Sequence, residues 1–190
     1  MPLYEFEGKR PSIDSKAFVH PDAVLIGDVV VEADCYVGAG AVLRGDIGSI
    51  RIGKGSNVQE NCVIHVFPDK SVILHPNSHI GHGAILHGCE ICSNVLVGMR
   101  AIIADGVKIN SFSFIGAGSF VPFGQEIPSH SLVVGYPAKV IQKVRPEHLE
   151  RIKDGLAIYQ DLTRRHLKSF REIPSEETKK DDPRGESVDS

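Results

Sequence analysis

The chain has 190 residues, of which 42% are hydrophobic and 24% charged, ordinary values for a globular protein with a real core. Its net charge of -3 argues against nucleic-acid binding. No apolar run approaches the ~20 residues of a membrane-spanning helix, and the polar N-terminus does not resemble a signal peptide. We therefore expect a cytoplasmic protein with no nucleic-acid or membrane partner.

Aliphatic residues recur every six positions along most of the chain. The first members of this series are Val19, Leu25, Val31, Val37 and Leu43. After a short insertion and a longer loop over 66–71, the series continues to Val133. A period of six fits neither a helix nor an alternating hairpin sheet. It fits a three-sided parallel coil, in which one aliphatic residue per side points inward and rungs lie about 4.8 Å apart.

The sequence thus predicts an all-β fold, a left-handed parallel β-helix of hexapeptide repeats over residues 11–140. From Pro146 onward the apolar spacing changes to three and four, which predicts an amphipathic C-terminal helix within 145–171. We expect this helix to pack along the coil, with Gly155 as its weak point. Residues 172–190 have almost no apolar content and are predicted to be disordered.

Three histidines occupy informative positions in the repeat. The aliphatic residues that precede Arg44, His65 and His87 lie three hexads apart, so these outward side chains share one face. His65 and His87 should therefore lie on adjacent rungs, close enough to share a metal. His82 belongs to another hexad and lies on a different face. A second coil would have to supply it, which predicts a cyclic oligomer, most simply a homotrimer with sites between subunits.

Three neutral imidazoles leave a fourth metal position open, the arrangement of a catalytic zinc site. Zinc lowers the pKa of its water to about 7, so we expect zinc-bound hydroxide as the nucleophile for a small electrophilic carbon. Gln59 and Asn61 are predicted to orient this nucleophile or the substrate. Arg44 and Asp46 are predicted to form an ion pair across the interface.

Other potential ligands have simpler interpretations. The remaining outward histidines are predicted to be surface residues, although a supporting role for His79 near His82 stays open. The four cysteines indicate reduced thiols. Cys89 and Cys92 have metal-ligand spacing, but Cys89 takes a core position and Cys92 follows an inward residue. The two side chains should diverge, which favours core filling.

Several stretches resemble the γ-class carbonic anhydrase family. They are LRGD (Leu43–Asp46), NVQENCVIH (Asn57–His65) and HIGHGAILHGC (His79–Cys89), and the resemblance spans about residues 10–170. VIHVFPD, LVGMRAIIADGVKI, VGYPAKVI and IYQDL are most similar to the bacterial branch linked to phenylacetic acid degradation and to the carnitine pathway.

This resemblance implies a homotrimer with zinc, or in some members iron or cobalt, at each subunit interface. It implies reversible CO2 hydration, or hydrolysis of a CoA thioester in the phenylacetic acid branch. The residues that it marks are the metal ligands His65, His82 and His87, the interface pair Arg44 and Asp46, the orienting residues Gln59 and Asn57, and Tyr159 on the terminal helix.

One departure from the family keeps other functions open. The archaeal members carry a glutamate proton shuttle in an acidic loop, whereas VFPDKS here offers only Asp69, and Ile47 follows Asp46 where those members have an acid. A hexapeptide acyltransferase, which binds CoA between coils and uses one histidine as base, is the first alternative. A metal-loaded trimeric binding or assembly protein with little activity is the second.

Overall fold

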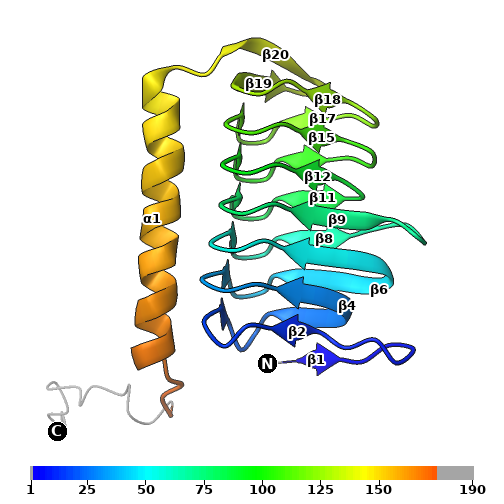
Figure 1. The fold of residues 1–190 in the computed structure, drawn as a ribbon, viewed down its shortest axis with the longest axis vertical. Helices are drawn as coiled ribbons and strands as arrows, with labels where there is room; N and C mark the ends of the chain where they lie inside the picture. The colour runs from blue at the N-terminus through cyan, green and yellow to red at the C-terminus, as the bar shows by residue number, and fades with distance from the viewer. Residues whose placement is uncertain (1, 175–190) are drawn as a thin grey trace, which may run out of the picture.

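The computed structural model describes residues 2–174, which form a three-sided left-handed parallel β-helix with one helix beside it (Figure 1). The predicted fold class is thereby confirmed. The segment predicted to be disordered lies outside the described residues from 175 onward. Within the described part of the chain, no helix is long and apolar enough to cross a membrane.

One side of the coil is covered by the helix α1, and another carries His65 and His87; we call them the helix-covered side and the histidine side. The helix-covered side, which α1 contacts, contains β3 (Phe18–Val19), β5 (Tyr36–Val37), β7 (Asn57–Val58), β10 (His79–Ile80), β13 (Leu96–Val97), β16 (Phe114–Ile115), β19 (Ser131–Gly135) and the antiparallel β20 (Ala138–Lys143). The histidine side contains β1 (Leu3–Tyr4), the first parts of β4 (Val24–Val31) and β6 (Val42–Ile52), β8 (Val63–His65), β11 (Ile85–His87), β14 (Ile102–Ile103) and β17 (Phe120–Val121).

The third side contains β2 (Ser12–Ile13), the second parts of β4 and β6, β9 (Ser71–Leu74), β12 (Glu90–Ile91), β15 (Lys108–Ile109) and β18 (Glu126–Ile127). β4 and β6 each bend from the histidine side onto the third side, and their pairing is interrupted between Gly27 and Val29. Gly27 has a φ of +71°, and an added Cβ would lie 2.4 Å from the carbonyl oxygen of Gly45. Glycine is therefore required where these two backbones approach each other.

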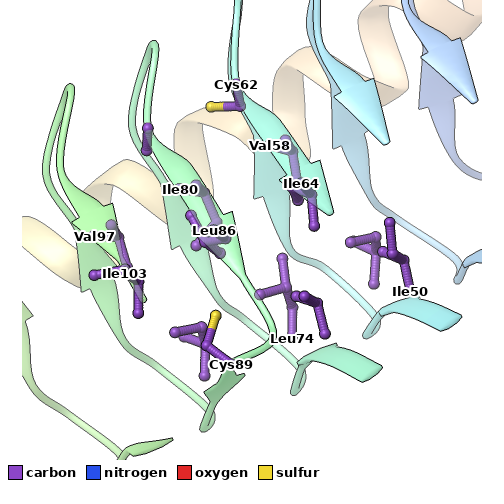
Figure 2. Close-up of a cluster of buried hydrophobic side chains, with 14 of the residues drawn as sticks. Ile50, Val58, Cys62, Ile64, Leu74, Ile80, Leu86, Cys89, Val97 and Ile103 are labelled. Carbon is purple, nitrogen blue, oxygen red and sulfur yellow. The ribbon is translucent and has the colours of Figure 1, made fainter. Parts of the chain in front are cut away.

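The pairing register confirms the predicted stacking. Leu43 pairs with Ile64, and Ile64 pairs with Leu86, on successive rungs. All three side chains are fully buried, and Figure 2 shows such aliphatic side chains stacked along the interior. Burying one side chain of this size contributes roughly 1.5–3 kcal/mol, so the same stacking that stabilises the coil also fixes which outward residues become neighbours.

The helix α1 (Pro146–Ser169) runs alongside the coil and returns from its C-terminal end toward its N-terminal end (Figure 1). Pro146 occupies its first turn, where a missing N–H costs nothing. Ile152 and Leu156 are buried against Leu96 of the helix-covered side. This apolar stripe attaches the helix to the coil, as the change of spacing predicted.

Replacing Ile64 by alanine should lower the free energy of unfolding by about 2–5 kcal/mol, because it leaves a cavity between two stacked rungs. Chemical denaturation followed by circular dichroism measures this change. The matched control is Ile158→Ala on α1, where the side chain is 63% exposed and its loss should cost little. Equal effects of the two substitutions would contradict the assignment of Ile64 to the core.

Candidate metal site on two sides of the coil

Two predicted ligands meet on the histidine side. His65 and His87 end strands β8 and β11, are paired in register, and bring His65 Nδ1 to 3.1 Å from His87 Nε2. Two nitrogen ligands of one tetrahedral zinc, each at 2.0–2.1 Å from the ion, lie about 3.3 Å apart. The two imidazoles therefore fit as neighbouring ligands of one ion.

The second nitrogen of each of these rings contacts a carboxylate. His65 Nε2 lies 3.3 Å from Asp46 Oδ1, and His87 Nδ1 lies 2.6 Å from Asp105 Oδ1. Carboxylates in this position fix the tautomer and orientation of metal-binding histidines. Asp105 was not found from the sequence. Its spacing of 18 residues from His87, one turn of the coil, is the signal that could have found it.

Arg44 lies one rung before His65 and affects its charge. Arg44 Nη1 donates to Asp46 Oδ2 at 2.8 Å within one chain, since both residues lie on the same face of β6. The prediction that these two residues pair across an interface therefore does not describe this contact. Partial burial acts to raise the pKa of Asp46, but bonds from Arg44 and the Ile47 backbone lower it overall. Burial, then the charge of Arg44, lowers the pKa of His65, which favours the neutral form that binds metals.

His82 lies on the helix-covered side, just after β10, as predicted from its hexad. Its Nδ1 contacts Glu60 Oε2 at 2.6 Å, and Glu60 Oε1 accepts a hydrogen bond from the Tyr36 hydroxyl at 3.0 Å. A proton on Nδ1 leaves Nε2 of His82 free to bind an ion. Glu60 was also missed, although it directly follows Gln59 and lies one rung before His82.

The predicted orienting residues Asn57 and Gln59 are buried beside His82. Gln59 Oε1 accepts a hydrogen bond from the His82 backbone N–H at 3.2 Å, and Gln59 Nε2 donates to Asn57 Oδ1 at 3.0 Å. Asn61 is different, because it is an exposed corner residue with a φ of +61°. Asparagine tolerates this backbone conformation, which accounts for Asn61 without an orienting role.

A cavity of about 360 Å³ opens beside these groups. Gln59, His82 and Tyr159 line its polar part, and Leu96 and Phe114 are among its apolar lining residues. Tyr159 of α1 thus lines the same cavity as His82. Burial, then the charge of Glu60, raises the pKa of Tyr159 to about 12, so its hydroxyl stays protonated at neutral pH and can donate a hydrogen bond.

One chain does not complete a three-histidine site. His82 follows a strand of the helix-covered sheet, whereas His65 and His87 belong to the other sheet. Among residues 2–174, the group of three potential ligands that lie within 4.8 Å of one another is instead His75, Glu90 and Cys92.

This second group connects neighbouring strands of the third side, and we call it the Glu90 ladder. The two carboxylate oxygens of Glu90 already contact His75 at 2.9 Å and Lys108 at 3.3 Å. Cys89 is buried in the core while Cys92 is half-buried on the outside, so the two cysteines diverge as expected. The group therefore does not alter the choice of site. His166 was expected on the surface but, like His20, His75 and His148, it is half-buried, and its ring centroid lies 4.5 Å from that of Phe18.

Solved structures with this coil define the class of protein. The chain is 36% identical to a putative acetyltransferase of Bacillus cereus, with a TM-score of 0.85 over 87% of this chain and 96% of that one. It is 33% identical to a hexapeptide transferase family protein of Anaplasma phagocytophilum, with a TM-score of 0.84 over 87% and 98% of the two chains. These similarities, together with the observed coil, show that the chain is a hexapeptide-repeat protein.

Curated relatives define the family more narrowly. The chain is 46% identical over 162 residues to the carnitine operon protein CaiE of Salmonella agona, covering 85% of this chain and 82% of the relative. It is 42% identical over 185 residues to CaiE of Escherichia coli K12, covering 97% and 94%. The chain belongs to the family of the carnitine operon protein CaiE. No protein-family model matches it. None of these four proteins is named as a carbonic anhydrase, so that assignment stays a prediction.

The four cysteines should react at very different rates. Burial raises the pKa of Cys35 to about 12, that of Cys62 to about 11 and that of Cys89 further still. We expect a thiol reagent at pH 7.5 to modify Cys92 well before the three core cysteines, and all four in denaturant. Mass spectrometry of the modified peptides measures the order, with Cys92→Ser as the control. Early modification of Cys89 would show that its side chain is not in the core.

Proposed function

We propose that the chain is a metal-dependent enzyme of the γ-carbonic anhydrase type that works as a cyclic trimer. His65 and His87 of one subunit and His82 of the next would hold a zinc-type ion, with iron or cobalt as possible replacements. The observation that supports this most is the 3.1 Å approach of His65 Nδ1 to His87 Nε2, with an aspartate on each remaining nitrogen. His82 carries its own carboxylate partner, Glu60, on the other side.

The surface around the histidine pair supports a second copy of the chain as the partner. Val63 and Ile85 point outward on the same strands as the two histidines and are 40% and 41% exposed. Ile102 and Phe120 extend this apolar row on the next two rungs. Large exposed apolar side chains in one row favour burial against another protein surface. The partner that the proposed site requires is a subunit that presents His82.

A bound zinc-type ion supplies a Lewis acid that acidifies water and polarises a carbonyl oxygen. The chain itself supplies the surroundings. Gln59 and Asn57 form a buried amide pair whose direction is fixed by the His82 backbone. The protonated Tyr159 hydroxyl is a donor beside the cavity. Substrates that fit this chemistry are CO2 or bicarbonate and, as the resemblance to the phenylacetic acid branch implies, a CoA thioester.

Acyl transfer is the second candidate, and the names of the two similar structures favour it. Such an enzyme would bind CoA between coils and use one histidine as base without a metal. The histidines available as that base are His79 and His82, which line the cavity beside Tyr159. The paired carboxylates on His65 and His87 have no part in this chemistry, which is why we place metal chemistry first.

The purified protein should contain about one zinc-type ion per chain in a trimer. His65→Ala, His82→Ala and His87→Ala should each abolish tight binding, because two imidazoles hold an exposed ion weakly. His75→Ala is the matched control and should leave the metal content unchanged, since the His75 side chain contacts Glu90 and follows β9 on the third side, away from the three proposed ligands. Elemental analysis with light-scattering mass measures both quantities.

Two activity assays then separate the candidate functions. Turnover of CO2 or of a CoA thioester that is lost in His65→Ala and on chelation supports the metal enzyme. Transfer of an acetyl group from acetyl-CoA by a metal-free trimer would contradict it and favour the acyltransferase. A metal-loaded trimer that turns over neither substrate would instead favour a binding or assembly role.

A further inference from the structure

His79 lies beside the proposed site but outside its ligand set. It is the outward residue of β10, stacked on Asn57 one rung earlier. An outward side chain on this coil normally faces water, but here α1 lies across the ring. Gly155 of the helix comes so close that an added Cβ would lie 2.9 Å from His79 Cε1. The Tyr159 ring meets the imidazole edge to face, with 5.6 Å between centroids.

This contact explains the glycine inside the helix. Glycine in a helix interior costs roughly 1 kcal/mol relative to alanine, and its φ here is ordinary, so backbone conformation does not require it. What requires it is the space taken by His79. The helix thereby approaches the coil at the level of the candidate site, and burial, followed by the charges of His82 and Arg151, lowers the pKa of His79 to about 4.

The hydrogen bonds around His79 fix the direction of Gln59. The Gln59 carboxamide must place Oε1 toward the His82 backbone N–H, which it meets at 3.2 Å. Its Nε2 then faces His79 Nε2 at 2.9 Å. Since an amide NH2 is only a donor, His79 Nε2 must be the acceptor and the ring proton belongs on Nδ1.

The hydrogen-bond network of His79, Gln59 and Asn57 has one donor more than it has acceptors. Asn57 Oδ1 accepts from Gln59, so its Nδ2 faces His79 Nδ1, at 3.2 Å. A neutral imidazole accepts at one nitrogen only, and the shorter contact favours Gln59 over Asn57. A charged imidazolium accepts at neither nitrogen and would release Gln59 as well. The network therefore needs a neutral ring at position 79.

We propose that His79 is a positioning residue, whose Nε2 accepts a hydrogen bond from Gln59 and holds this side chain against the backbone of His82. Gly155 gives α1 the room to pack against the ring and to cover part of it. The docking of the C-terminal helix is thus connected to the geometry beside His82. The proposal rests on the proposed function only in taking Gln59 as the group that orients water or substrate.

The test compares His79→Phe, which keeps a planar ring but removes the acceptor, with His79→Gln, which restores an acceptor oxygen. The control is His75→Phe, on the third side of the coil beside Glu90. In the metal-loaded trimer we expect kcat to fall roughly tenfold or more in His79→Phe, with metal content and KM little changed, and to recover in part in His79→Gln. A kcat for His79→Phe equal to that of the His75→Phe control would overturn the proposal.

Nuclear magnetic resonance tests the same claim without any activity. In the wild-type protein, as purified, the nitrogen shifts of His79 should show an unprotonated Nε2 that does not titrate above pH 5. The side-chain amide signal of Gln59 should lose its distinct shift in His79→Phe but not in His75→Phe. A ring that carries its proton on Nε2, or that titrates near pH 6.5, would overturn the proposal. If the wild-type protein shows no turnover, the proposed function fails and these shifts still decide the role of His79.

Discussion

The stacking of inward aliphatic side chains is the constraint on which the rest of this structure depends. Because Leu43, Ile64 and Leu86 lie directly above one another, the residues that follow them must also stack on the outside. A slip of one residue would turn every side chain to the opposite face and cost the whole core. The approach of His65 to His87 is therefore maintained by the hydrophobic interior, not by local contacts between the rings.

Carboxylates orient the three histidines of the proposed site. Each histidine has one carboxylate on one of its ring nitrogens: Asp46 contacts His65, Asp105 contacts His87, and Glu60 contacts His82. Each ring therefore has a preferred orientation before any ligand arrives. Because folding has already fixed these rings, little further side-chain entropy is lost when a ligand binds. On the helix-covered side, α1 adds Tyr159 to the cavity beside His82 and packs against His79, so the terminal helix contributes to the proposed site as well as to the apolar cluster with Leu96.

Period and register predicted the fold, the terminal helix, the adjacency of His65 with His87 and the separate face of His82. They did not reveal Asp105 or Glu60, because a repeat assigns a face and a rung but not the direction of a long side chain. The repeat likewise could not show that Asn61 lies at a corner where the backbone has a positive φ. The sequence predicted Gly155 to be a weak point of the helix. Its close contact with His79 could not be foreseen, because the contact forms only when the helix packs on the coil.

The central claim is that each metal site is divided between two subunits, and mixed trimers test it most directly. His82→Ala subunits keep His65 and His87, while His65→Ala subunits keep His82, so neither variant alone has a complete site. Refolding them together in equal amounts should restore metal at about a quarter of the interfaces, where the two intact faces meet. Elemental analysis of the mixed trimers measures this recovery. Metal retained by either variant alone, or no recovery in mixed trimers, would contradict the account.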